Sequence, residues 1–128
     1  MTDPLVTAAR AAQQQAYAPY SRFHVGAALE SEDGRVFVGC NVENASYGLT
    51  ICAERAAVCA AVSAGARRFR RVVVVSDSVP AAAPCGACRQ VLAEFGPDLR
   101  IDGVGPNGTS SWTIADLLPV AFSKEQLT

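Results

Sequence analysis

The stretch PCGACRQ, residues 84–90, places two cysteines three positions apart, between a proline and an arginine. The run VVVV at 72–75 precedes it, and so short an apolar run predicts a buried strand. The residues after Cys88 continue as a helix that ends at Gly96-Pro97, so the cysteine pair opens a helix. A redox pair, half of a metal site and two buried thiols all fit this pattern, and the motif alone leaves the three readings open.

Cys52 supplies a third thiol, at the start of a second predicted helix, TICAERAAVCAAVSAGARR (50–68), which is closed by Gly65. The positive end of a helix favours thiolate, and cysteines at i and i+3 share one helical face. Three thiols at two helix starts are therefore candidates for zinc ligands. Cys59 lies two turns after Cys52, a rise of roughly 10 Å, so these two cannot hold one ion. Cys40 falls in an alternating strand and is expected to be a small core residue.

Three protein ligands leave the fourth position of a zinc ion to water, which is the pattern of a catalytic site. Glu54 follows Cys52 in the first turn, where its side chain can reach past the helix end and move protons to and from that water without binding zinc. A glutamate that merely complements the helix dipole is the alternative. Arg55 and Arg89 each follow a cysteine closely and are expected to donate to thiolate sulfurs and offset their charge. Solvated surface arginines are the alternative.

A hairpin is predicted around Asp33-Gly34, and its returning strand ends with Asn41 and Glu43. These two residues stand at i and i+2, so their side chains face the same way. An amide beside a carboxylate suits the hydroxyls of a sugar, and a polar loop entrance is the alternative. The other parity of this strand is apolar: Val36, Val38, Cys40 and Val42.

The 128 residues suit one domain with one hydrophobic core. Asp3-Pro4 predicts the start of a first helix and Pro19 its end. The predicted order is helix, hairpin, helix, strand, helix, strand, which indicates an α/β sandwich around a mixed sheet. Only 18% of the residues are charged and many are small, which suggests more buried surface than one small domain needs, and hence an oligomer.

The composition also excludes several classes of protein. The net charge of −1 and the lack of a basic run make nucleic acid an unexpected partner. No apolar run reaches the length that spans a membrane, and the N-terminus lacks the order of a signal peptide. Five cysteines, an odd number, do not form a secreted disulfide framework, so a cytoplasmic location is expected.

Cys52-Ala53-Glu54 together with PCGAC (84–88) resembles the zinc-dependent deaminase signature in its all-cysteine form. More blocks, in the same order as in the family, resemble the small homotetrameric cytidine deaminases. These blocks are PYSRFHVGAAL (19–29), GCNVENASYG (39–48), ICAER (51–55), PCGACRQVL (84–92) and DLLPVAF (116–122). The resemblance implies one deaminase domain over residues 1–128, a three-layer α/β sandwich with a mixed five-stranded sheet flanked by helices, and a homotetramer with active sites shared between subunits.

The resemblance further implies that Cys52, Cys85 and Cys88 bind one Zn²⁺ per chain and that Glu54 is the proton shuttle. Zinc would lower the pKa of its water to about 7, and the resulting hydroxide would attack C4 of the base. Cytidine and deoxycytidine would become uridine and deoxyuridine, as in pyrimidine salvage.

Further roles in substrate binding follow from the resemblance alone. Asn41 and Glu43 match the pair that holds the ribose hydroxyls, and Phe23 matches the aromatic ring that packs against the pyrimidine. Ala53 matches a position whose backbone helps to hold the base. The aromatic positions around the site, some of them contributed by neighbouring subunits, are matched by Tyr20, Tyr47 and Phe122.

Three other functions remain as alternatives. A related deaminase could act on another amino-pyrimidine nucleoside such as blasticidin S, although Asn41 with Glu43 favours an ordinary ribose. A noncatalytic zinc module would need four protein ligands and has no use for Glu54. A thiol redox protein would not need Cys52.

Overall fold

The centre of the molecule is a mixed five-stranded sheet with the strand order β2-β1-β3-β4-β5. The computed structural model describes residues 3–127. The strands are β1 (Gly26–Ser31), β2 (Val36–Cys40), β3 (Phe69–Val75), β4 (Arg100–Gly105) and β5 (Gly108–Thr113). β3 and β4 run parallel, and the other neighbouring strands run antiparallel. The predicted fold class is confirmed.

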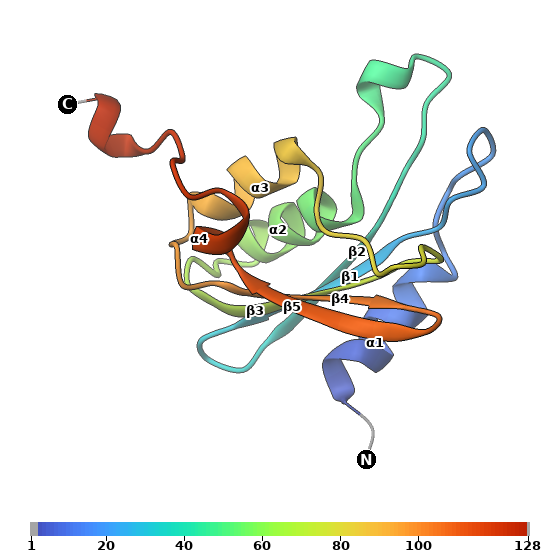
Figure 1. The fold of residues 1–128 in the computed structure, drawn as a ribbon, viewed down its shortest axis with the longest axis horizontal. Coiled ribbons are helices and arrows are strands. Elements are labelled where there is room, and N and C mark those ends of the chain that lie inside the picture. The colour runs from blue at the N-terminus through green and yellow to red at the C-terminus, as the bar shows by residue number, and fades with distance from the viewer. Residues whose placement is uncertain (1–2, 128) are drawn as a thin grey trace.

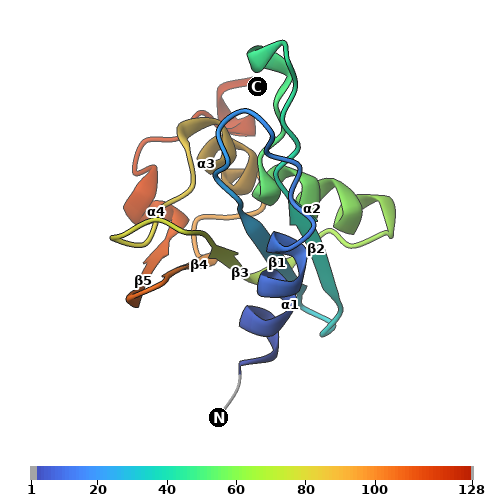
Figure 2. The ribbon, with the colours of Figure 1, turned by 90° about the vertical axis from the view of Figure 1, so that its right-hand side faces the viewer.

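Helices cover both faces of the sheet and complete three layers (Figure 1, Figure 2). α1 (Pro4–Gln13) lies on one face, and α2 (Ala53–Ser63), α3 (Gly86–Ala93) and α4 (Ile114–Leu117) lie on the other. Val73 and Val75 of β3 pack with the α1 side, whereas Val72 and Val74 pack with the α2 side. Successive side chains of a strand point to opposite faces of the sheet, so the four valines of β3 contribute alternately to two hydrophobic clusters.

The first helix begins as the sequence predicts but ends earlier. The Asp3 carboxylate caps it by accepting a hydrogen bond of 3.0 Å from the backbone N–H of Leu5. The helix ends at Gln13, well before Pro19. Tyr17 instead forms an isolated bridge with Val42, so the chain must be extended there and cannot be helical.

The face of β2 that packs against helix α2 is not the expected one. Val36 and Val38 are 44% and 45% exposed, and Cys40 is half-buried rather than a core residue. The buried side of the strand carries Phe37 and Gly39. A Cβ at Gly39 would lie 2.5 Å from the Ala53 carbonyl oxygen, so only glycine lets the start of α2 approach the strand this closely.

The segment between β2 and α2 extends away from the sheet (Figure 1, Figure 2). It contains a short 3-10 helix, Tyr47–Leu49, and it is held at its base by a bridge between Val42 and Ile51. A second 3-10 helix, Lys124–Leu127, ends the described chain. Among residues 3–127 no helix is both long and apolar enough to cross a membrane.

Candidate active site

Three cysteines meet where helices α2 and α3 begin. Cys52 is the N-cap residue of α2, Cys85 is the N-cap residue of α3, and Cys88 lies in the first turn of α3. Their sulfur atoms all lie within 4.8 Å of one another, and the Sγ atoms of Cys52 and Cys85 are 3.7 Å apart. Cys40 and Cys59 are not members of this group, so the structure brings together the three thiols that the sequence singles out.

The spacing of the sulfur atoms fits a zinc ion. Tetrahedral zinc with Zn–S bonds of about 2.3 Å separates its sulfur ligands by about 3.8 Å. The 3.7 Å between Cys52 and Cys85 matches this value, and no described histidine or carboxylate completes the group as a fourth ligand. A zinc ion held here would keep one open position, which is the arrangement of a catalytic site rather than a structural one.

Arg55 contacts the thiol group directly. Its Nη2 atom donates to the Sγ atom of Cys52 and to the Thr50 carbonyl oxygen, each at 3.4 Å. A hydrogen bond with Cys88, together with Arg55, lowers the pKa of the Cys52 thiol to about 5. Cys52 is therefore a thiolate at neutral pH, which is the form that binds metal.

Glu54 is a buried carboxyl group beside this cluster. Glu54 is 5% exposed, and burial raises the pKa of its carboxyl group to about 7. The negative charge of Cys52 contributes to this rise. A group with a pKa near the working pH can both accept and release a proton, which is what general acid–base catalysis needs. A glutamate that only complements the helix dipole would be solvated, so this environment favours the chemical role over the alternative.

A cavity of about 260 Å³ opens onto the thiol group. It is lined by Phe23, Val25, Asn41, Glu43, Thr50, Cys52, Ala53, Glu54, Val74, Ser76, Ala82, Ala83 and Cys85. Most of the residues that the sequence predicts to contact zinc or substrate line this cavity. Its apolar walls with a few polar groups are typical of a site for a small, flat ligand.

Asn41 and Glu43 both line this cavity, and both also hold the chain around it. The side chain of Asn41 donates to the Phe23 carbonyl oxygen at 2.7 Å and accepts from the backbone N–H of Val25 at 2.9 Å. Glu43 accepts from the backbone N–H groups of Tyr20 and Ser21 and from the Ser21 hydroxyl. The Ser21 hydroxyl also holds the pKa of Glu43 below its usual value, so Glu43 is ionised at neutral pH.

Of the aromatic residues expected around the site, only Phe23 lines the cavity beside the thiol group within one chain. Tyr47 is 74% exposed and, with Tyr20, lines a neighbouring cavity that shares Glu43 and Thr50 with the first. The rings of Tyr20 and Tyr47 meet edge to face at 6.0 Å. Phe122 lies in a separate cavity beside the end of α3, so within one chain it is away from the thiol group.

Arg89 has partners other than those expected. Its Nε atom donates to the Pro84 carbonyl oxygen at 2.8 Å, and its Nη1 atom donates to the Leu117 carbonyl oxygen at 3.0 Å. The side chain thus runs back along α3 and ties the loop before Cys85 to the end of α4. The sequence places Arg89 next to Cys88 but cannot show that nearby carbonyl groups accept from its Nε and Nη1 atoms, and the role predicted for it at a sulfur atom stays a prediction.

Several residues of the cavity were missed in the sequence. Ser76 directly follows β3 and is 4% exposed, and Ala82 and Ala83 come from the loop before Cys85. A signal was available for Ser76, because ligands of α/β sheets gather beyond the carboxyl ends of parallel strands. The two alanines give no chemical signal, since they contribute only shape.

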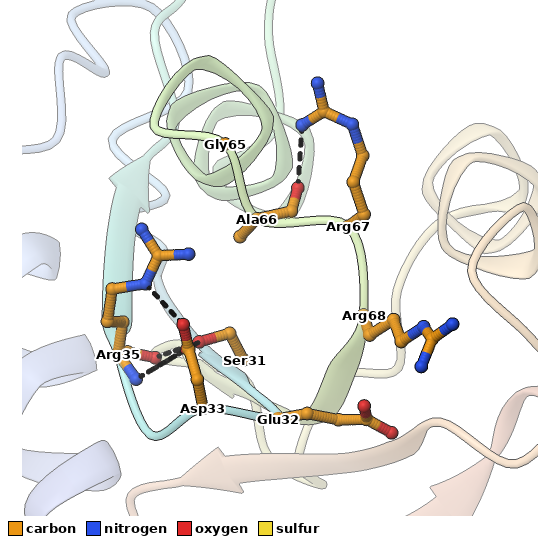
Figure 3. A pocket seen from close by; sticks show the side chains of 8 residues that line it. All are labelled: Ser31, Glu32, Asp33, Arg35, Gly65, Ala66, Arg67 and Arg68. Carbon is orange, nitrogen blue, oxygen red and sulfur yellow. Dashed lines mark hydrogen bonds and ion pairs between the residues drawn. The ribbon is translucent and has the colours of Figure 1, made fainter.

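A second cavity, of about 280 Å³, lies at the opposite end of α2 between the hairpin turn and the loop before β3 (Figure 3). Three of its lining residues are arginines, but two of them donate to backbone carbonyls near the end of α2. Arg35 donates to the Ala64 carbonyl oxygen at 3.1 Å and Arg67 to that of Val62 at 2.9 Å. Cations at the negative end of a helix complete its last turn, so these arginines have a structural role.

The comparisons with known proteins agree on one family. The family model of the cytidine and deoxycytidylate deaminase zinc-binding region matches residues 2–101. A cytidine deaminase of Sporosarcina psychrophila is 48% identical over 128 residues, 98% of this chain and 94% of the relative. The crystal structure of a cytidine deaminase from Burkholderia pseudomallei matches with a TM-score of 0.90 at 52% identity, over 95% of this chain and all (100%) of the other. A blasticidin-S deaminase of Bacillus cereus is more distant, 31% identical over 113 residues, 81% of this chain and 80% of the relative.

Proposed function

The chain belongs to the cytidine and deoxycytidylate deaminase family, and from that membership we propose that the cavity beside Cys52, Cys85 and Cys88 is its active site. The protein is a zinc-dependent hydrolase that converts cytidine and water to uridine and ammonia, and deoxycytidine to deoxyuridine. The observation that carries the proposal is a group of three thiols within 4.8 Å of one another, which shares its cavity with a buried carboxyl group.

Cys52, Cys85 and Cys88 hold one zinc ion per chain in this proposal. The bound metal supplies a Lewis acid that makes water nucleophilic at neutral pH. The two helix N-termini favour the thiolate forms of the ligands, and the Arg55 guanidinium offsets part of their negative charge.

Glu54 moves the protons of the reaction. It accepts a proton from the attacking water, gives it to ring N3 so that C4 becomes electrophilic, and then carries a proton to the departing amino group. Its burial and its pKa of about 7 support both halves of this task, because neither the ionised nor the neutral form is strongly disfavoured near pH 7.

The nucleoside lies between Phe23 and the loop that carries Cys85. Phe23 packs against the pyrimidine, and the backbone of Ala53 helps to hold the base. Within the part of the chain that the structure describes, the Asn41 amide donates only to the Phe23 carbonyl oxygen and keeps its second hydrogen for a ligand, and Glu43 is an ionised acceptor. One donor and one acceptor side by side suit the hydroxyl groups of the sugar, so a nucleoside is the substrate rather than a free base.

Four copies of the chain form a homotetramer whose active sites are completed by neighbouring subunits. Apolar side chains that the single chain leaves exposed support this arrangement, since Val36 and Val38 of β2 and Tyr47 of the projecting segment are uncovered. Phe122 is 59% exposed on the C-terminal segment and is available to a neighbouring active site. In the cell, we place this reaction in cytoplasmic pyrimidine salvage.

The similarity to a blasticidin-S deaminase does not favour that activity. The cytidine deaminases of Sporosarcina psychrophila and Mycobacterium tuberculosis match at 48% and 52% identity, against 31% for the blasticidin-S enzyme. The Asn41–Glu43 pair also suits an unmodified ribose. A noncatalytic zinc module is disfavoured because three thiols leave a coordination position open beside Glu54.

The test combines metal analysis with turnover of cytidine, followed by the change in ultraviolet absorbance. The wild-type protein should carry about one zinc per chain and deaminate cytidine. Cys52→Ala, Cys85→Ala and Cys88→Ala should each lose zinc and activity, whereas Cys40→Ala and Cys59→Ala should retain both. A fully active preparation without metal would overturn the proposal.

A further inference from the structure

Gln13 is a buried polar residue that belongs to none of the roles described above. It is the last residue of α1 and is 8% exposed. Its Nε2 atom donates to the His24 carbonyl oxygen at 3.1 Å and to the Asp77 carboxylate at 3.3 Å. Both hydrogens of the amide are thus used, and they reach two segments that lie far apart in the sequence.

Each of these two segments forms a wall of the active-site cavity. His24 stands between Phe23 and Val25, which both line the cavity. Asp77 follows Ser76, which lines the cavity at the start of the loop that leads to Cys85. The Gln13 amide therefore joins the wall that carries the Phe23 ring to the wall that ends at a zinc ligand.

The strand-like segment around Phe23 is held from two sides. Asn41 bonds the Phe23 carbonyl oxygen and the Val25 N–H group from inside the cavity, while Gln13 bonds the His24 carbonyl oxygen from outside. Successive carbonyl groups of an extended chain point in opposite directions, so one partner cannot do the work of the other. Without Gln13 the segment would keep its bonds to Asn41 and Ser21 but lose the attachment at the His24 carbonyl oxygen.

The position of α1 does not depend on this amide. A Cβ at Gly26 would lie 2.0 Å from the Ala9 carbonyl oxygen and 2.4 Å from the Gln13 backbone nitrogen, so the backbone of α1 already rests on β1. Leu5 and Ala9 add apolar packing against the same face of the sheet. Removing the Gln13 amide should therefore leave the helix in place and release only the two walls.

We propose that Gln13 is a positioning residue of the deaminase: its side-chain amide sets the distance between the Phe23 wall and the Ser76–Cys85 wall. This inference rests on the proposed function of the cavity. Among residues 3–127 the Asp77 carboxylate has no other hydrogen-bond or ion-pair partner, so the loop that follows β3 loses this attachment when the amide is removed. A ring displaced by a fraction of an ångström packs less well against the bound base, which weakens binding of substrate and transition state alike.

The decisive variant is Gln13→Leu, which keeps the size of the side chain and loses both donors. We expect KM for cytidine to rise about 5- to 20-fold while kcat stays within about 2-fold, with zinc content unchanged. Gln13→Lys should restore KM, because its ammonium group can donate to the same carbonyl and pair with Asp77. Gln14→Leu is the matched control. Gln14 is exposed and lines, with Gln13, His24 and Asp77, a cavity separate from the active-site cavity, so its replacement should leave both constants unchanged.

A second variant tests the other end of the contact. Asp77 is exposed, so Asp77→Ala should fold even if Gln13→Leu does not, and it should raise KM in the same direction. The KM of the double variant should not exceed that of the more affected single variant, because both changes break the same Gln13–Asp77 connection. A lower melting temperature with an unchanged KM in Asp77→Ala or in folded Gln13→Leu would overturn the proposal and leave Gln13 a purely structural role. Wild-type protein without deaminase activity would instead overturn the proposed function.

Discussion

The guanidinium of Arg55 lies 3.4 Å from the Sγ atom of Cys52, so a cation three positions along the chain contacts the first thiol of the group. The start of α2 presents a thiol and a buried carboxyl group to the cavity, and it places a cation against that thiol. The Nε atom of Arg55 is buried and has no partner among the described residues, which leaves a donor available to a second thiolate sulfur. From this contact we expect Arg55 to offset part of the negative charge of the thiolates without binding the metal.

Arg55→Gln should weaken zinc binding by about 10- to 100-fold, because thiolate ligands lose a donor that offsets their charge. Competition with a coloured chelator measures this affinity. Arg68→Gln removes the same charge from an exposed position at the other end of α2 and should leave the affinity unchanged. Equal zinc affinity in both variants would show that Arg55 does not tune the site.

Glu54→Gln should retain zinc and fold but lower kcat by about 10²- to 10⁴-fold, since the amide cannot carry protons. Stopped assays with metal analysis on the same samples separate the two effects. Glu94→Gln, at an exposed position after α3, is the control and should behave as wild type. Activity within a few-fold of wild type in Glu54→Gln would return Glu54 to a helix-dipole role.

Glu43→Ala should lower kcat/KM for cytidine by about ten-fold or more, because a sugar hydroxyl loses its ionised acceptor. Wild-type enzyme should in turn deaminate cytosine far more slowly than cytidine and gain nothing from a 5′-phosphate. Rates on cytosine, cytidine and cytidine monophosphate measure both effects, with Glu32→Ala at the distant hairpin turn as the control. Equal rates on cytosine and cytidine would remove the sugar-binding role from this residue.

Val38→Lys should break the proposed tetramer, because a charge would be buried where β2 now presents an exposed valine. Sedimentation should give about four times the 13.4 kDa chain mass for the wild type and a smaller species for the variant. Thr109→Lys, on strand β5 at the other edge of the sheet, should leave the mass unchanged. A monomeric wild type would exclude Tyr47 and Phe122 as contributions from neighbouring subunits.

Asp102→Asn should destabilise the fold at neutral pH by about 2–4 kcal/mol, because a buried carboxylate holds three donors. Asp102 is 1% exposed and accepts from Arg71 Nε at 2.7 Å, Arg100 Nε at 3.1 Å and Ser111 Oγ at 2.6 Å. Burial alone would raise the pKa of Asp102, but these hydrogen bonds outweigh it and hold the pKa below its usual value.

This lowered pKa sets the pH dependence of the same contact. The carboxylate stabilises the fold fully above the unfolded pKa of about 3.9, and the stabilisation is lost as the pH falls through the lower folded pKa. The difference in unfolding free energy between wild type and Asp102→Asn should therefore shrink in acid below about pH 4. Denaturant titrations at a series of pH values measure it, and Asp98→Asn, at an exposed position, should show no difference. A constant difference in unfolding free energy between wild type and Asp102→Asn across this pH range would contradict the lowered pKa of Asp102.

The types and order of the elements could be predicted from the sequence because local chemistry sets them. Asp3-Pro4 starts α1, Asp33-Gly34 makes the turn between β1 and β2, and Gly96 ends the region of α3 with a φ of 116°. The cysteines could be placed at helix starts for the same reason. These signals act between residues that are close in the sequence, so they can be recognised without knowing how the rest of the chain folds.

The meeting of distant residues was decided only by the tertiary structure. Packing against α2 turned the Phe37 and Gly39 face of β2 inward, although the alternating valines favoured the other face. Carbonyl groups at Pro84 and Leu117 took the donors of Arg89, and Gln13 acquired two partners that no local pattern indicates. The sequence by itself determined which residue types stand at the helix starts. Which side chains share a cavity depends on how the layers pack, because hydrogen bonds and apolar contacts between distant segments form only when the chain is folded.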